Sequence, residues 1–309
     1  MTQTRVLLTG GSGMVGQNIL EHPAAKDWEF IAPGSKKLDL RDYSATLAFV
    51  QATRPDTVIH CAGRVGGIQA NIAHPVEFLV TNLDLGRNII LASKAAGVSK
   101  LLNLASSCMY PRNAPNPLGE ELILRGELEP TNEGYALAKI FATRLCQYIQ
   151  RETPSLAYKT LIPCNLFGRH DKFAPEHSHL IPAIIHKIHL AKYQGLETVE
   201  IWGDGTARRE FMYAGDLADA TLRALREFEQ IPDLMNIGLG ADYSIQDYYI
   251  CAASVIGWSG EFVYDTTKPV GMKQKLVAVD KQRQWGWMPQ TSLRDGIKKA
   301  YHYYLQEYK

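Results

Sequence analysis

The sequence lacks several features that would assign a function at once. Its five cysteines, at positions 61, 108, 146, 164 and 251, form an odd and scattered set without the spacing of a metal site. This usage is typical of a reducing compartment. No apolar run approaches the roughly 18 residues that a membrane-spanning helix needs. An apolar strand already begins at Val6, so we expect no signal peptide, no membrane partner and a cytoplasmic location.

A strong charge of either sign is also missing. The net charge is +1 over 309 residues, which does not supply the basic surface on which nucleic-acid binding depends. Internal repeats and low-complexity tracts are absent too. The length suits a single α/β unit with an appended lobe. We therefore expect a soluble globular protein that binds no nucleic acid.

What the sequence does contain is an alternation of buried strands and helices. Apolar runs predict strands at 6–9, 29–32, 57–61, 101–105 and 158–162, and helical periodicity marks 76–97. Alternation of this kind predicts an α/β fold, a Rossmann-type doubly wound parallel sheet. We expect a dinucleotide-binding domain at 1–165 and a smaller, mixed substrate lobe at 166–309. Segments near 230–257 are expected to return to the first domain.

A glycine-rich turn joins the first predicted strand to a helix. Gly10, Gly13 and Gly16 have the spacing G-x-x-G-x-x-G, which permits a tight turn and lets a helix N-terminus face a pyrophosphate. The alternative is an ordinary strand-to-helix turn, but the position directly after a clean apolar strand favours a dinucleotide site. The expected contacts come from Gly10, Gly11, Ser12, Gly13, Met14, Val15 and Gly16.

The segment after the second strand predicts which nicotinamide cofactor is used. NAD enzymes typically place an acid here for the ribose 2′-hydroxyl. This chain instead has Lys36 and Lys37, two cations that suit the 2′-phosphate of NADP(H), although both could simply be solvated. Asp39 is the competing candidate for the ribose. We expect it to meet the adenine edge, with Leu40 beside the ring.

Three residues form a candidate catalytic group. Ser106 follows the fourth strand, and Tyr135 and Lys139 have the i, i+4 spacing that places both on one face of a helix. A nearby cation favours phenolate, so we expect the pKa of the tyrosine to fall towards the working range of a proton donor or acceptor. Ala62 and Gly63 follow the third strand, where they can approach the cofactor closely. Because the carboxyl ends of parallel strands meet at one edge, these stretches converge on one site.

Further motifs resemble those of one family. GRVGGIQAN, SSCMYPR, ELEPTNEGYALAK, PCNLFGRHDKF, SHLIP and WGDGTARREF, in this order, are similar to motifs of the GDP-L-fucose synthase family of extended short-chain dehydrogenase/reductases. The resemblance implies NADPH-dependent epimerisation at C3 and C5 and reduction at C4 of a GDP-4-keto-6-deoxy-hexose. Two departures are PCN in place of PTN and KPVG in place of KPDG. The second lies where nucleotide-sugar contacts are expected, so the exact sugar stays open.

The resemblance also implies roles for residues in the second half of the chain. It makes His179 an acid-base residue that also borders the cofactor, and it implies a homodimer formed through helices at 76–97 and 135–150. Contacts beside the nicotinamide are expected from Pro163, Asn165 and Leu166. Contacts with the GDP-sugar are expected from Lys187, Trp202, Arg209 and Lys268.

The chemistry of a 4-keto sugar suggests a role for Cys108. The ketone acidifies the hydrogens on C3 and C5, so a base and an acid on opposite faces of the ring can invert each centre. Cys108 lies at a strand end near expected cations that favour thiolate, and we expect it to be the base, with His179 returning the proton. The competing interpretation is a small buried hydrophobic residue. His170, His177 and His179 could suggest zinc, but no fourth ligand has suitable spacing, so we expect no metal.

Three other function classes remain as alternatives. The first is a plain 4-ketosugar reductase, or an enzyme acting on a heptose or dideoxyhexose. The second is a sugar-nucleotide epimerase or dehydratase that retains NAD. A dehydratase would place acids where this chain has Ser107 and Cys108. The third is a dinucleotide-binding sensor, which intact Ser106, Tyr135 and Lys139 disfavour.

Overall fold

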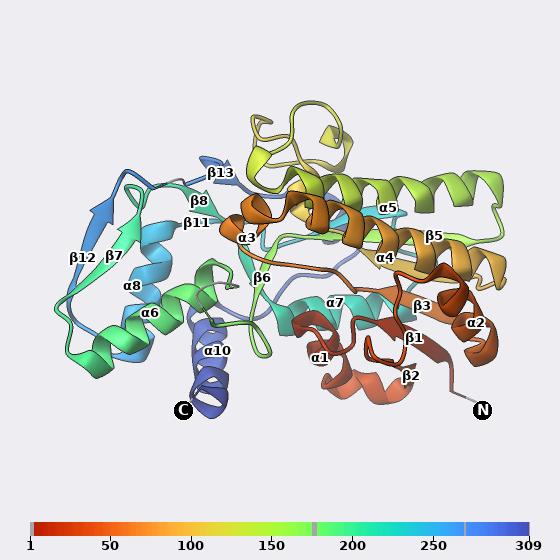
Figure 1. Ribbon diagram of the computed structural model, residues 1–309, viewed down its shortest axis with the longest axis horizontal. Helices are drawn as coiled ribbons and strands as arrows, with labels where there is room; N and C mark the ends of the chain where they lie inside the picture. Colours follow the sequence, from red (N-terminus) through yellow and green to blue (C-terminus); the bar gives the residue numbers. More distant parts are fainter. Residues whose placement is uncertain (1–2, 175–177, 269, 309) are drawn as a thin grey trace.

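The fold is built on one parallel sheet of six strands (Figure 1). The computed structural model describes residues 3–174, 178–268 and 270–308, so His177 lies outside the described residues. The strand order is β10-β5-β4-β3-β1-β2, with every neighbouring pair parallel. The strands are β1 (Arg5–Thr9), β2 (Glu29–Ile31), β3 (Thr57–His60), β4 (Lys100–Leu104), β5 (Ala157–Pro163) and β10 (Leu234–Ile237). The predicted doubly wound parallel sheet is confirmed.

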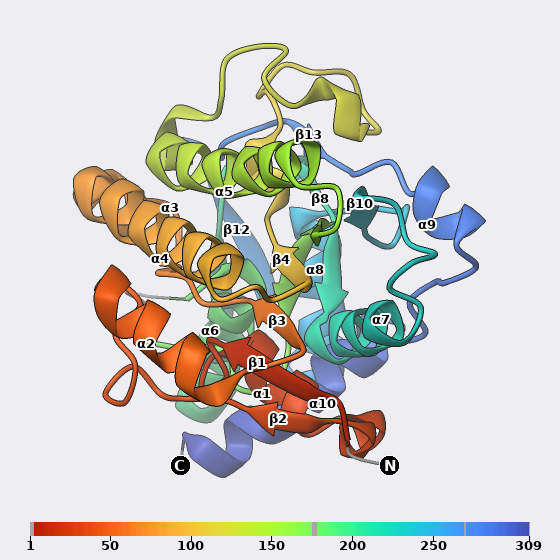
Figure 2. The ribbon, with the colours of Figure 1, turned by 90° about the vertical axis from the view of Figure 1, so that its right-hand side faces the viewer.

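Helices cover both faces of this sheet (Figure 2). One face is covered by α1 (Met14–Leu20) and α7 (Ala214–Arg226), the other by α2 (Tyr43–Thr53), α4 (Pro75–Ala95) and α5 (Glu133–Glu152). Successive side chains of a strand point to opposite faces, and Leu7 and Leu8 accordingly belong to different hydrophobic clusters. Both are fully buried, so the sheet is apolar on its two sides.

The C-terminal lobe carries a third hydrophobic cluster. Its helices are α6 (Leu180–Gln194), α8 (Ile245–Ile256) and α10 (Leu293–Glu307). Its small sheets pair β12 (Glu261–Asp265) with β7 (Thr198–Trp202), and β8 (Arg208–Arg209) with β11 (Tyr243–Ser244) and β13 (Gln274–Lys275). The last pair, β6 (Asn165–Phe167) and β9 (Phe211–Tyr213), and the short helix α9 (Asp280–Gln284) connect the lobe to the main sheet. Since β10 lies in the main sheet, we retain a boundary near residue 165 as a proposal, with 234–237 returning.

Two local features are not evident from the sequence. A helix, α3 (Ile68–Ala73), begins inside the glycine-rich stretch 63–71. The Asn71 side chain donates to the carbonyls of Gly66 and Gly67 and closes this short helix on its own entry turn. Asp216 lies in the first turn of α7 and does not cap the helix, which begins two residues earlier. Its carboxylate instead accepts hydrogen bonds from Thr291, because it is buried against the segment that leads to α10.

Candidate active site

The site lies where the strands of the main sheet end. Gly10 follows β1, Ala62 and Gly63 follow β3, Ser106 follows β4 and Asn165 follows β5. Since these strands are parallel, their carboxyl ends share one edge of the sheet, and the predicted stretches come together there.

The glycine loop packs closely against the next strand end. Gly10 has φ +76°, and a Cβ on it would lie 2.6 Å from the backbone nitrogen of Ala62. Gly13 caps α1 with no side-chain bond, and the first turn holds no acid. Such a turn leaves free N–H donors at a helix N-terminus, which suits a pyrophosphate. The loop therefore fits a dinucleotide as the sequence suggested.

The loop after β2 presents its cations to solvent. Lys36 and Lys37 are both exposed. Asp39 is held by Arg41, whose Nε and Nη2 donate to its carboxylate at 2.9 and 2.7 Å. These hydrogen bonds lower the pKa of Asp39 to about 2. The acid that competed for the ribose is thus already paired. Leu40 is 6% exposed in the core, so its contact with an adenine ring stays a prediction.

Ser106, Tyr135 and Lys139 are brought together as predicted. Ser106 caps the turn after β4, and its Oγ accepts the backbone N–H of Cys108 at 3.3 Å. Tyr135 and Lys139 lie on α5, with the Lys139 Nζ 5.8 Å from the centre of the tyrosine ring. That Nζ donates to the carbonyl of Leu104 at 3.0 Å, which fixes the buried ammonium at the end of β4.

The predicted fall in the pKa of Tyr135 was wrong for the free protein. Burial raises that pKa above its usual value, a neighbouring Cys108 charge adds to the rise, and a hydrogen bond with Ser106 opposes it. Burial also lowers the pKa of Lys139. Desolvation dominates because the folded chain buries the phenol. Tyr135 therefore stays protonated near neutral pH, which suits a proton donor.

Burial keeps both Cys108 and His179 neutral. Cys108 is 5% exposed, and burial raises the pKa of its thiol, although Lys275 and Lys139 lower it. The expected cations do favour the thiolate of Cys108, but burial outweighs them, so the thiol stays protonated. His179 precedes α6, and burial lowers the pKa of its imidazole, with Lys172 and Lys275 adding to the effect.

The segment after β5 is held against the substrate lobe. Pro163 ends β5, and the side chain of Asn165 donates to the carbonyl of Glu210 at 2.9 Å. Leu166 packs partly buried against the main core. This segment passes the same sheet edge as the glycine loop, so its predicted place beside the nicotinamide fits the geometry.

The predicted substrate contacts gather on the C-terminal lobe. Lys187 on α6 donates to the carbonyl of Glu200 at 2.7 Å, and Trp202 at the end of β7 donates to the carboxylate of Glu200 at 3.0 Å. Lys268 lies 5.7 Å from the centre of the Trp202 ring. Arg209 donates to the carbonyls of Arg208 and Val270, both at 2.8 Å. Because Lys187 and Arg209 donate to neutral carbonyls here, both cations are suited to an anionic ligand.

One charged residue of the site was missed from the sequence. Burial lowers the pKa of the Lys275 amine on β13, and the charges of Cys108, Arg209, Cys164 and Glu129 act on it. The signal that could have found it is the alternation Lys275, Val277, Val279, in which both valines are buried. A lysine in phase with two inward-facing valines points to the interior.

Metal and membrane features add no further constraint. Within the described residues, no three His, Cys, Asp or Glu side chains form a group that could hold a metal ion. Nor does any helix in the described part of the chain have the length and apolar character needed to cross a membrane.

Comparison with known proteins agrees with the site. The model of the NAD dependent epimerase/dehydratase family matches residues 6–238. A GDP-L-colitose synthase of Yersinia pseudotuberculosis is 51% identical over 98% of both chains. A GDP-L-fucose synthase of Azorhizobium caulinodans is 51% identical over 97% of this chain and 96% of its own. A GDP-L-fucose synthetase of Naegleria fowleri bound to NADP superposes with TM-score 0.88 at 27% identity, covering 100% and 96% of the two chains.

These matches cover the sheet, the glycine loop and the substrate lobe together. The chain therefore belongs to the NAD dependent epimerase/dehydratase family and, within it, to the GDP-L-fucose synthase group that its motifs indicated.

Proposed function

We propose that this protein is an NADP(H)-dependent epimerase and reductase that converts a GDP-4-keto-6-deoxy-hexose to GDP-L-fucose. The observation that carries the proposal is the grouping of two sets of residues at one sheet edge. Ser106, Tyr135 and Lys139 suit reduction of a ketone, and Cys108 beside them suits epimerisation. The relatives at 51% identity support the same substrate class.

In the first stage, the site moves protons on C3 and C5. Once the Cys108 proton has passed to His179, the Cys108 thiolate takes a proton from the ring carbon. The His179 imidazolium then returns a proton from the opposite face, which leaves both side chains neutral again. The developing negative charge falls on the C4 oxygen, where the hydroxyls of Ser106 and Tyr135 stabilise it. Lys275 favours the thiolate of Cys108, because its charge lowers the pKa of that thiol against burial.

In the second stage, the C4 ketone is reduced. NADPH supplies the hydride when bound. Tyr135 donates its proton to the C4 oxygen, and Ser106 holds that oxygen against the phenol. Lys139 stabilises the tyrosinate that forms, which offsets the desolvation that otherwise keeps the phenol protonated.

Separate residues are assigned to the GDP part of the substrate and to the cofactor. Lys187, Arg209 and Lys268 attract the diphosphate and nucleotide, and Trp202, which is 38% exposed, provides a flat face for stacking. Lys36 and Lys37 attract the 2′-phosphate of the cofactor. The residues of the glycine loop, with Ala62 and Gly63, approach the cofactor backbone.

The test is direct conversion of the ketone. The protein is incubated with GDP-4-keto-6-deoxy-mannose and NADPH, and NMR of the product gives the configuration at each ring carbon. We expect GDP-L-fucose with equal consumption of NADPH. A 4-reduced sugar with unchanged C3 and C5 would leave only the reductase half of the proposal.

A second candidate has a specific observation in its favour. The relative named GDP-L-colitose synthase is as similar as the relative named GDP-L-fucose synthase, so a related GDP-4-keto sugar, such as a dideoxyhexose, is the alternative substrate. Val270 stands within KPVG, and its carbonyl holds Arg209 in the substrate lobe. Comparing kcat/KM for GDP-4-keto-6-deoxy-mannose with kcat/KM for the corresponding 4-keto dideoxyhexose separates the two candidates.

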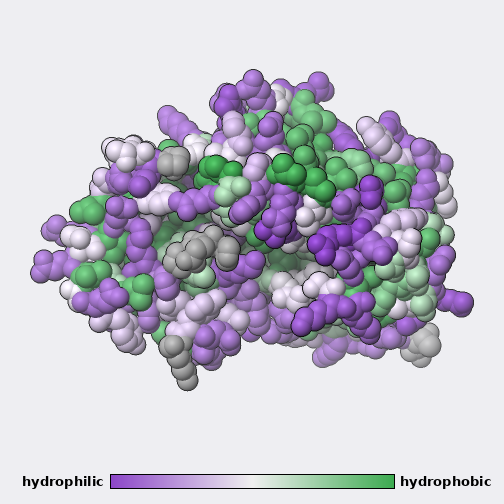
Figure 3. Space-filling view, in the orientation of Figure 1, coloured by the Kyte–Doolittle hydropathy of each residue, from purple (hydrophilic) through white to green (hydrophobic). Residues whose placement is uncertain are grey.

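We also propose a cytoplasmic homodimer. Apolar side chains gather over α4 and α5 on the face shown in Figure 3. Val76, Val80, Leu137, Phe141 and Tyr148 are all exposed there, Val76 at 73%. Contiguous apolar side chains on paired helices are typical of a buried interface. Light scattering of Phe141→Glu and wild type tests the pairing: we expect a monomer and a dimer, and a wild-type monomer would contradict the proposal.

A further inference from the structure

Glu210 is a fully enclosed carboxylate that none of the assigned roles uses. It lies between β8 and β9 and is 1% exposed. Its Oε1 accepts the backbone N–H groups of Leu239 and Gly240 at 2.6 and 3.0 Å, and its Oε2 accepts that of Val277 at 2.9 Å. A Cβ on Gly238 would lie 2.5 Å from Oε1, so the chain closes directly around the carboxylate.

The segments that Glu210 joins carry the cations of the site. Arg209 immediately precedes it, and Lys275 lies two residues before Val277. Strand pairing places Lys275 opposite Arg209 in the parallel pair β8–β13. The backbone carbonyl of Glu210 also accepts the side chain of Asn165 from the cofactor side. One residue thus connects both cations to the segment beside the nicotinamide.

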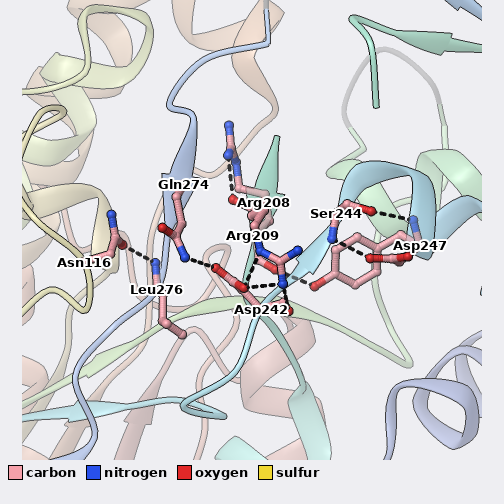
Figure 4. A network of polar contacts seen from close by, with 9 residues as sticks. Asn116, Arg208, Arg209, Asp242, Ser244, Asp247, Gln274 and Leu276 are labelled. Carbon is pink, nitrogen blue, oxygen red and sulfur yellow. Dashed lines mark hydrogen bonds and ion pairs between the residues drawn. The ribbon is translucent and has the colours of Figure 1, made fainter. Parts of the chain in front are cut away.

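The strand β13 depends on side-chain anchors for its position. It is only two residues long, and it pairs with a strand of equal length. Figure 4 shows Gln274 donating to Asp242 and the backbone of Leu276 donating to Asn116, at 2.6 and 2.8 Å. The bond from Val277 to Glu210 is the next anchor along the chain. Lys275 therefore lies between fixed points on either side.

Arg209 and Lys275 carry like charges on paired strands. Burial and, to a smaller degree, the charge of Arg209 lower the pKa of Lys275, so the two cations repel each other. Glu129 is the carboxylate whose charge acts on both. The hydrogen bonds of the Glu210 oxygens come from backbone N–H groups. The contribution of Glu210 is geometric.

We propose that Glu210 is a positioning residue for substrate binding. It fixes the strand pair β8–β13, and with it Arg209, which contacts the substrate's diphosphate, and Lys275, which favours the thiolate of Cys108. The proposal deepens the proposed function and rests on it. Loss of the bond to Val277 frees β13, and the two cations then move apart. Asn165 is held through the backbone carbonyl, so the cofactor side keeps its support when the carboxylate changes.

The test measures binding of two stable ligands at pH 8. GDP-mannose, a diphosphate diester without a titrating phosphate near this pH, and NADPH are titrated calorimetrically into wild type and variants. Glu210→Gln keeps the shape but turns an amide N–H₂ towards one of the backbone donors. Glu210→Asp keeps the charge but is too short to span Leu239 and Val277. Gln282→Met is the matched control, because Gln282 exchanges two hydrogen bonds with Gly238 in the same loop without touching β13.

We expect Glu210→Gln and Glu210→Asp each to weaken GDP-mannose by about tenfold or more, the scale of a hydrogen bond to a charged group. NADPH should stay within about twofold in all proteins, and Gln282→Met should leave both affinities within that range. Normal GDP-mannose binding by Glu210→Asp would mean that the charge of the carboxylate matters and its reach does not. That result would overturn the proposal. So would equal weakening of both ligands, or the same loss in Gln282→Met.

A failure of the proposed function would give a different result from a failure of the role of Glu210. A wild-type protein that binds NADPH but not GDP-mannose removes the proposed function, and the role of Glu210 falls with it. Should the Glu210 variants not fold, hydrogen exchange of the wild type decides. GDP-mannose must then increase protection of the amides of Lys275 and Val277, and unchanged protection would contradict the proposal.

Discussion

At the scale of single residues, burial and charge compete, and their balance was not visible in the sequence. The spacing of Tyr135 and Lys139 correctly placed them on one helix, and the strand end correctly placed Ser106 beside them. The sign of the pKa shift at Tyr135 depended instead on how completely the folded chain buries the phenol. The same holds for Cys108. Sequence spacing gives proximity, but desolvation is a property of the folded chain.

Replacing the proton donor should separate chemistry from binding. Tyr135→Phe removes the hydroxyl and leaves the ring, so turnover should fall by at least about a hundredfold. The affinity for NADPH should change little, because the phenol contributes a proton and no charge. Steady-state rates and a calorimetric titration of NADPH measure the two quantities. An active variant would remove Tyr135 from the mechanism.

Replacing the thiol should separate epimerisation from reduction. Cys108→Ser keeps the size of the side chain, but its much higher pKa makes it a poor base. Exchange of the C3 and C5 hydrogens with deuterated water should slow far more than NADPH oxidation on a pre-epimerised ketone. NMR of the sugar and absorbance of NADPH follow the two processes. Equal loss of both would mean that Cys108 positions the ring.

At the scale of elements, regular structure was predictable and short irregular structure was not. Apolar runs located five strands of the main sheet, since a strand buried on both faces reads as a continuous apolar stretch. The helix α3 was missed because six residues between a glycine loop and Pro75 carry too little periodicity. The register of β13 was invisible as well, because it is set by contacts from Glu210, Asp242 and Asn116, distant in sequence.

The loop after β2 should carry the preference between cofactors. Replacing Lys36 and Lys37 together by Ala should weaken NADPH by about 1–3 kcal/mol, the scale of charge-assisted hydrogen bonds, and NADH little. Lys298→Ala, an exposed lysine on α10, is the control for general loss of positive charge. Fluorescence titration with each cofactor gives the affinities. Equal weakening of NADPH and NADH would contradict a role for these lysines at the 2′-phosphate.

At the scale of the whole molecule, the protonation of Glu210 makes the free energy of unfolding depend on pH. Burial, with a smaller contribution from Asp242, raises the pKa of its carboxyl from 4.5 to about 7. A carboxyl whose pKa is raised in the folded state adds stability below its unfolded pKa and loses it as the pH rises through the folded value. The free energy of unfolding should therefore fall between pH 5 and pH 8 by this contribution.

Urea unfolding at the two pH values tests this coupling. Glu210→Gln cannot titrate, so the difference in unfolding free energy between wild type and variant isolates the one group from all others. We expect wild type to lose up to about 3 kcal/mol relative to the variant from pH 5 to pH 8. A difference that stays constant with pH would place the carboxyl pKa near its ordinary value.

The most direct measurement of the central claim is the isotope pattern of the product. The protein converts GDP-4-keto-6-deoxy-mannose in deuterated water with ordinary NADPH, and NMR locates deuterium on the ring. If Cys108 and His179 exchange protons at C3 and C5 while hydride reaches C4 from the cofactor, the product carries deuterium at C3 and C5 and protium at C4. Protium at all three carbons would contradict the account, because the protein would then be a reductase that never breaks the C–H bonds at C3 and C5.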